Sequence, residues 1–76
     1  MTRKLIVYSA HAKRRLKERR ITRREVRGVL ATGSASELSN LGTRKDSVVD
    51  GRRIAELYRE YRRGLYIWTV MLVPRD

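Results

Sequence analysis

Residues 9–25 read Ser-Ala-His-Ala-Lys-Arg-Arg-Leu-Lys-Glu-Arg-Arg-Ile-Thr-Arg-Arg-Glu, and they predict two helices in succession. Ser9 is a favourable N-cap residue, so the first helix is expected from Ala10 to about Arg20. Ala12 and Leu16 stand four residues apart and predict its buried stripe. Most of the other side chains of this helix are cationic and face water.

A second helix start follows directly. Thr22 and Glu25 fit a capping box, and Ile21 is positioned to pack on Val26 as a hydrophobic staple. The helix is expected to end at Gly33, which predicts an αα-hairpin. Its apolar face consists of Val26, Val29 and Leu30.

The remaining segments predict strands and turns. Residues 4–8 are β-branched and aromatic and predict a short first strand. Residues 33–43 are rich in Ser, Gly and Asn and predict a loop, with one short edge strand around Ser36 to Leu38. Residues 65–73 are apolar on both faces and predict a central strand with a neighbour on each side.

Residues 52–60 carry two conflicting signals. Asp50-Gly51 lies between β-formers and is a two-residue hairpin signal, which makes 52–60 a strand. Helical spacing is shown instead by Ile54, Leu57, Tyr58 and Tyr61. We favour the strand, because a second turn at residues 62–64 leads into the apolar run, and the helix is the alternative.

The net charge is +11 over 76 residues and is concentrated at one end of the chain. Residues 1–27 contain eleven Lys or Arg and two Glu, a net charge of +9. A positive field on one element suits a polyanion, because neutralising phosphates releases condensed counterions. The alternative is a solvated surface of an arginine-rich protein. We expect nucleic-acid contacts from Lys13, Arg14, Lys17, Arg20, Arg23, Arg24 and Arg27.

The length of the chain predicts a single domain over residues 1–76, so any site lies on a face or in a shallow groove. The absence of cysteine excludes disulfides and thiolate metal sites, and nothing indicates an oxidising compartment. The longest apolar run, residues 65–73, is far shorter than the roughly 20 residues of a membrane-spanning helix. We therefore expect a cytoplasmic protein without a membrane partner.

His11, the only histidine, stands four residues before Arg15 and eight before Arg19. These positions drift by only about 40° per step around a helix, so the three side chains form one row. A ribonuclease without metal needs a base, cations for the phosphorane and an acid. We assign His11 as the base and the two arginines as the cations. Tyr58 is assigned as the acid, and the other candidates are Tyr61, Tyr66 and an arginine.

Each of these residues also has a structural interpretation. His11 after a helix cap is often a plain surface residue. Arg15 and Arg19 are long enough to cover apolar surface and pair with Glu56 or Glu60. The eight carboxylates show no metal-ligand spacing and one histidine cannot build a zinc site, so we expect no metal, and no cofactor is implied.

The chain also resembles the family of small domains of unknown function numbered 4258, which is similar to the RelE and BrnT ribonuclease toxins of toxin–antitoxin pairs. The residues that carry the resemblance are Ser9, His11, Ala12, Arg15, Arg19 and Ile21, with Thr69-Val70 as a weaker match. The resemblance implies a RelE-like α+β fold, in which two N-terminal helices pack on a twisted, mainly antiparallel sheet in the order β-α-α-β-β-β. It also implies an endoribonuclease site.

Three functions are therefore open. The first is a metal-independent endoribonuclease toxin that acts on free or ribosome-bound RNA and is controlled by an acidic antitoxin. The second is a noncatalytic RNA- or DNA-binding module with the same fold. The third is a partner-binding relative of such a toxin that forms a homodimer through its sheet edge.

Overall fold

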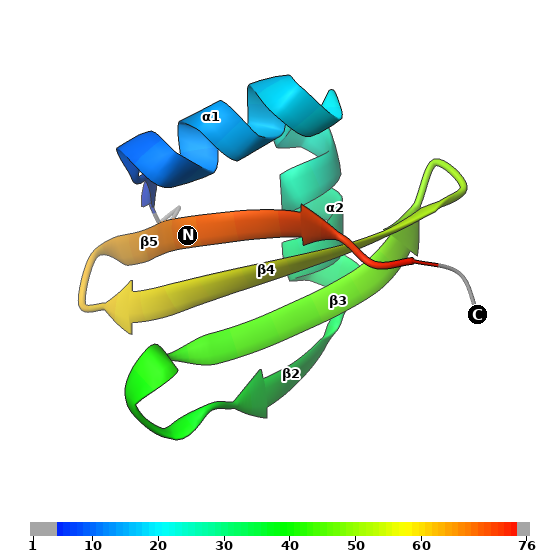
Figure 1. Ribbon diagram of the computed structural model, residues 1–76. Coiled ribbons are helices and arrows are strands. Elements are labelled where there is room, and N and C mark those ends of the chain that lie inside the picture. The colour runs from blue at the N-terminus through cyan, green and yellow to red at the C-terminus, as the bar shows by residue number, and fades with distance from the viewer. Residues whose placement is uncertain (1–4, 75–76) are drawn as a thin grey trace.

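Two helices and a five-stranded, mostly antiparallel open sheet make up residues 5–74, the part of the chain that the computed structural model describes (Figure 1). The predicted α+β class is confirmed, with one strand more after the helices than the order β-α-α-β-β-β. The elements are β1 (Leu5–Tyr8), α1 (Ala10–Arg19), α2 (Arg23–Thr32), β2 (Ser34–Glu37), the short 3₁₀ helix η1 (Ser39–Leu41), β3 (Thr43–Val49), β4 (Arg52–Tyr61) and β5 (Gly64–Leu72).

The additional strand is β2, which forms the edge strand expected in the loop of residues 33–43, two residues earlier than predicted. The strand order in the sheet is β1-β5-β4-β3-β2. β1 runs parallel to β5, and the other neighbours are antiparallel. β5 is therefore a central strand, as its two apolar faces predicted.

The N-cap of α1 also attaches this helix to the sheet. The Ser9 hydroxyl accepts a hydrogen bond from the Ala12 amide at 2.9 Å and donates one to the Trp68 carbonyl oxygen at 2.9 Å. β1 pairs with β5 only as far as Tyr8 and Ile67. Beyond that point α1 packs along β5, above it in Figure 1. Ser9, which caps α1, thus also determines where this helix contacts β5.

The capping box at the start of α2 is confirmed, and Ile21 and Val26 both belong to the core. Gly33 ends the helix with φ −75°, which is not a left-handed conformation. A Cβ at this position would lie 2.7 Å from the Val29 carbonyl oxygen and 2.8 Å from that of Asp46. Glycine is required here because β3 approaches the helix end closely.

The strand assignment for residues 52–60 is confirmed. Asp50 and Gly51 have φ values of 51° and 80°, which fits a type I′ turn between β3 and β4. β4 lies between two other strands, and every residue from Ile54 to Tyr58 is buried. The helical spacing misleads because a strand that is buried on both faces also places apolar residues three and four positions apart.

An irregularity in the pairing of β4 with β5 changes the faces of β5. Leu57 pairs with Thr69 and the next residue, Tyr58, pairs with Ile67, so Trp68 is the extra residue. A bulge of this kind redirects the side chains on either side of it. Ile67 therefore points into the core, whereas Thr69 points toward the opposite face of the sheet.

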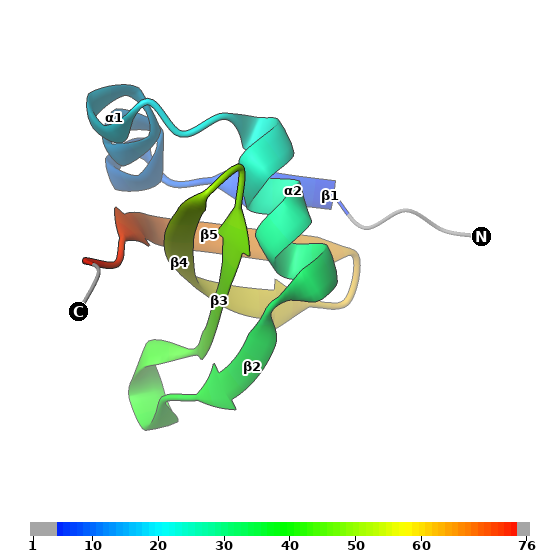
Figure 2. The ribbon, with the colours of Figure 1, turned by 90° about the vertical axis from the view of Figure 1, so that its right-hand side faces the viewer.

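The core lies between the helices and one face of the sheet. α2 lies behind the sheet in Figure 1, and Figure 2 shows α1 above the sheet and α2 to the right of β3 and β4. The buried hydrophobic cluster consists of Tyr8, Ala12, Leu16, Ile21, Val26, Val29, Ile54, Tyr58, Ile67 and Val70. No helix within residues 5–74 is long and apolar enough to span a membrane.

Candidate nucleic-acid interface

The structure brings His11 against Thr69, 58 positions later in the chain. The distance from His11 Nε2 to Thr69 Oγ1 is 3.1 Å. The imidazole is exposed, whereas Thr69 is 8 % exposed. When Nε2 donates to the threonine hydroxyl, Nδ1 keeps its lone pair and can take up a proton. Thr69 thus acts as an anchor for the ring, and the weaker part of the family motif lies beside the stronger one.

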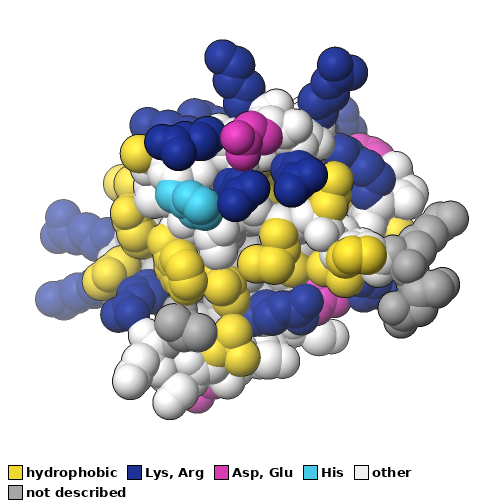
Figure 3. Space-filling model, in the orientation of Figure 1, with side chains coloured by type: hydrophobic (Ala, Val, Ile, Leu, Met, Phe, Trp, Pro, Cys, Tyr) yellow, Lys and Arg dark blue, Asp and Glu magenta, His cyan; other side chains and the backbone are white. Residues whose placement is uncertain are grey.

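Arg15 and Arg19 line a hollow of about 250 Å³ next to this pair. We call it the α1–β5 hollow, and its lining residues are Arg15, Arg19, Thr69, Val70, Met71 and Leu72. Figure 3 shows the histidine beside Lys and Arg side chains and above a band of hydrophobic side chains. Two residues of the row predicted on the first helix, Arg15 and Arg19, therefore line this hollow, and His11 contacts its wall at Thr69.

The two arginines are available to an anion. Arg15 lies 3.5 Å from Glu18, and both side chains are about half exposed, so this ion pair is weak. Within residues 5–74, the Arg19 guanidinium makes no ion pair. Glu56 does not neutralise either arginine, because its carboxylate has no hydrogen-bond partner in the described part of the chain.

A network that sequence reasoning missed holds the end of α1 in place. Arg52 donates to the carbonyl oxygens of Arg19 at 3.0 Å and Arg20 at 2.9 Å. It also donates to both oxygens of Glu25 at 2.8 Å. Glu25 is 4 % exposed, and the hydrogen bond from Arg52 is the main cause that lowers its pKa. The capping box identified Glu25, but no local signal connects it with a residue 27 positions away.

The structure does not place Tyr58 at the site, which corrects its assignment as the acid. Tyr58 is 6 % exposed, belongs to the core and does not line the α1–β5 hollow. Burial raises its pKa, and Glu56 adds to this effect. A largely buried tyrosine that does not line the hollow is not positioned to protonate a leaving group there. Neither of the other two tyrosine candidates, Tyr61 and Tyr66, lines this hollow.

The seven basic residues predicted to bind nucleic acid divide between two surfaces. All seven are exposed. Four lie on or directly after α1, whereas three lie on α2, which is behind the sheet in Figure 1. The Arg23 guanidinium lies over the Tyr8 ring, 4.9 Å from its centroid. The α1 group is Lys13, Arg14, Lys17 and Arg20, and the α2 group is Arg23, Arg24 and Arg27.

Apolar side chains gather at a different place, the edge formed by β1. Leu5 is 69 % exposed, Val7 52 % and Tyr61 58 %. They line a hollow of about 280 Å³ together with Arg63, Gly64, Leu65 and Tyr66. We call this surface the β1 edge. Exposed apolar side chains on an edge strand are typical of a protein contact surface.

Comparison with known proteins places this chain in a family. Residues 8–71 match the family model described as Domain of unknown function (DUF4258). The matched range contains His11, Arg15, Arg19 and Thr69. No curated protein and no solved structure gives a significant match.

Proposed function

We propose that this chain, which belongs to the family described as Domain of unknown function (DUF4258), is a metal-independent endoribonuclease. In this proposal it acts in the α1–β5 hollow. The observation that carries this proposal is the contact between His11 and Thr69 beside Arg15 and Arg19. Arg15 and Arg19 line the hollow, and His11 contacts Thr69 in its wall. These groups can serve as the base and the cations of cleavage next to a 2′-hydroxyl, and water serves as the acid.

The reaction uses these groups as follows. Thr69 accepts a hydrogen bond from His11 Nε2, and Nδ1 takes the proton of the RNA 2′-hydroxyl. O2′ then forms a bond to phosphorus, the bond from phosphorus to O5′ breaks, and O5′ takes a proton from water. Arg15 and Arg19 stabilise the negative charge on the phosphorane. The products are a 2′,3′-cyclic phosphate and a 5′-hydroxyl.

A relation to the RelE and BrnT toxins is part of this proposal. It is supported by the two helices on an open, mostly antiparallel sheet and by the net charge of +11. In this proposal the substrate is cytoplasmic RNA, and an acidic antitoxin inhibits the enzyme by covering His11, Arg15 and Arg19 on α1.

Cleavage of a chimeric oligonucleotide tests the proposal. The substrate is DNA with one ribonucleotide, incubated with EDTA, and products are identified by mass spectrometry. We expect His11→Ala and Arg15→Ala each to lower the cleavage rate by about 100-fold or more. Thr69→Val leaves His11 present but removes its anchor, so we expect a smaller loss of about 10-fold.

The matched control is Arg62→Ala. It removes the same side chain from an exposed position in the turn between β4 and β5, away from α1, and should change the rate by less than about threefold. Equal rates for wild type, His11→Ala and Arg15→Ala overturn the site. Binding of RNA with a steep salt dependence, but without cleavage, replaces the enzyme with a noncatalytic RNA-binding module.

A second candidate function, partner binding, is favoured by the β1 edge. Leu5 and Val7 expose more than half of their surface on a strand that has only one neighbour in the sheet. In this case the protein is a dimer that Val7→Lys converts to a monomer, as measured by sedimentation. A monomeric wild type at all accessible concentrations excludes the homodimer.

A further inference from the structure

A second hollow continues the α1–β5 hollow toward the hairpin that joins β3 and β4. It encloses about 500 Å³ and is lined in part by Arg19, Gly51, Arg52 and Leu72. We call it the hairpin hollow. Arg19 and Leu72 line both hollows, so the two form one continuous surface. The volume lies in the range of about 300–1,000 Å³ that is usual for small-molecule sites.

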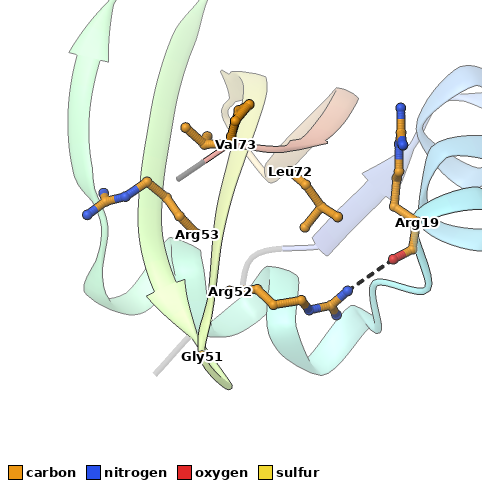
Figure 4. A pocket seen from close by; sticks show the side chains of 7 residues that line it. Arg19, Gly51, Arg52, Arg53, Leu72 and Val73 are labelled. Atoms are coloured by element: carbon orange, nitrogen blue, oxygen red, sulfur yellow. Dashed lines mark hydrogen bonds between the residues drawn. The ribbon is translucent and has the colours of Figure 1, made fainter. Parts of the chain in front are cut away.

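The wall of the hairpin hollow is aliphatic. Leu72, Val73 and Pro74 contribute one side of it. Figure 4 shows Leu72 between Arg19 and Val73, whereas the Arg53 side chain points away from them. Arg53 pairs instead with Asp46 at 2.9 Å. The hollow therefore offers a flat apolar body more contact than it offers a charge.

Among residues 5–74, Arg19 is the one cation available at the junction of the two hollows. Arg52 lines the hollow, but its guanidinium donates to Glu25 and to the carbonyl oxygens of Arg19 and Arg20. Figure 4 shows the bond to the Arg19 oxygen. Within the described residues, Arg19 has no ionic partner. An aliphatic wall next to one uncommitted guanidinium matches a ligand that has one apolar planar part and one anionic part.

We propose that the hairpin hollow is a nucleoside subsite, which holds the base and sugar of a nucleotide whose phosphate binds between Arg15 and Arg19. This inference rests on the proposed function, because it assumes that the α1–β5 hollow binds a phosphate. It adds where the nucleoside next to that phosphate binds, and it states that the contact with the nucleoside is apolar. A base in this hollow packs on Leu72, Val73 and Pro74.

The subsite has little means to distinguish one base from another. The Val73 amide already donates to the Arg53 carbonyl oxygen at 2.9 Å, and Nη1 and Nη2 of Arg52 already donate to Arg19, Arg20 and Glu25. Recognition by packing alone tolerates every base, because each base has an apolar face. We expect affinities for the four nucleotides that agree within about threefold.

Titration of ¹⁵N-labelled protein with three small probes tests the subsite. The probes are inorganic phosphate, uridine and uridine 3′-monophosphate. Phosphate should shift the amide signals of Thr69 and Met71 but not those of Gly51 and Val73. The monophosphate should shift all four signals and bind about 10-fold more tightly than phosphate. Uridine alone should shift Gly51 and Val73 weakly.

Two variants separate the subsite from the phosphate site. Val73→Asn makes the wall polar without changing charge, and it should reduce monophosphate affinity to within about twofold of phosphate affinity. Val48→Asn is the same substitution at an exposed position of β3 that lines neither hollow, and it should have no effect. A monophosphate that shifts only Thr69 and Met71 overturns the subsite and leaves the proposed function in place. The absence of any shift with phosphate and with monophosphate overturns both.

Discussion

Two glutamates are buried in this small protein, and their surroundings are opposite. Glu25, at the corner between the helices, is 4 % exposed and accepts hydrogen bonds from Thr22 and Arg52. Glu56, in the middle of β4, is fully buried, and within the described residues neither of its oxygens has a hydrogen-bond partner. The main cause that lowers the pKa of Glu25 is its hydrogen bond from Arg52, whereas burial raises that of Glu56 to about 8.

The difference follows from where the possible partners are. Glu56 lies on the same face of β4 as the core residues Ile54 and Tyr58. Its partners on the neighbouring strands are Val70 of β5 and Lys45 of β3. The Lys45 ammonium lowers the pKa of Glu56 only partly, and it donates its hydrogen bond to the Leu30 carbonyl oxygen at 2.7 Å. Glu25 thus holds α2 against β4 through Arg52, whereas Glu56 is stable in the fold mainly as the neutral acid.

Removal of the arginine that pairs with Glu25 should have the largest effect. Arg52→Met leaves a buried carboxylate without its cation and the α1 carbonyls without donors, and we expect a loss of about 3–5 kcal/mol of unfolding free energy. This loss approaches the whole stability of a small domain. Urea denaturation followed by circular dichroism measures it.

Arg53→Met is the matched control for that experiment. Arg53 is the next residue, and it pairs with Asp46 while remaining about half exposed. Its substitution should cost less than about 1 kcal/mol. Similar losses for the two variants contradict a special role for the corner. Should Arg52→Met fail to fold, Arg52→Lys keeps the charge and should fold with an intermediate stability.

Glu56→Gln should change how stability depends on pH. The native state keeps a proton that the unfolded chain releases above the ordinary pKa of 4.5, so the stability of the wild type should fall as pH rises from 4.5 to about 8. Glutamine does not titrate, so the variant should be a few kcal/mol more stable than wild type at pH 9 and nearly equal to it at pH 4.5. Thermal unfolding across this range gives both curves.

Glu25 acts in the opposite direction. Its lowered pKa stabilises the fold above 4.5, and this contribution is lost as the pH falls through the folded-state pKa. The two carboxylates together predict a stability maximum under mildly acidic conditions. A wild-type stability that rises steadily from pH 5 to pH 8 contradicts the neutral state of Glu56.

The smallest effect is expected at the N-cap of α2. Thr22→Ala removes the hydroxyl that accepts from the Glu25 amide at 3.0 Å, which should cost about 1 kcal/mol. Thr32→Ala, at the other end of the same helix, removes an exposed hydroxyl and should cost less. If the two variants lose equal stability, the cap contributes no more than the exposed hydrogen bonds of Thr32 with Gly28 and Ser47.

Most of the fold could be predicted because its signals are local. The Ser9 and Thr22 caps, the Asp50-Gly51 turn and the apolar β5 each depend on residues within one turn or strand. The row of His11, Arg15 and Arg19 follows from helical spacing alone. The assignment of Tyr58 as the acid could not be excluded in this way, because only the packing of β4 shows that its side chain belongs to the core.

The sequence by itself determined the two helix starts, the hairpin, the central strand and the concentration of positive charge on α1, since caps, turns and periodicity act over a few residues. Only the tertiary structure decided that Thr69 contacts His11, that Arg52 binds Glu25 at the corner between the helices and that Glu56 has no hydrogen-bond partner among the described residues. The first two of these join residues at least 27 positions apart, and the third depends on how the helices cover the sheet. Sheet pairing and helix packing set those positions, and no local pattern carries that information.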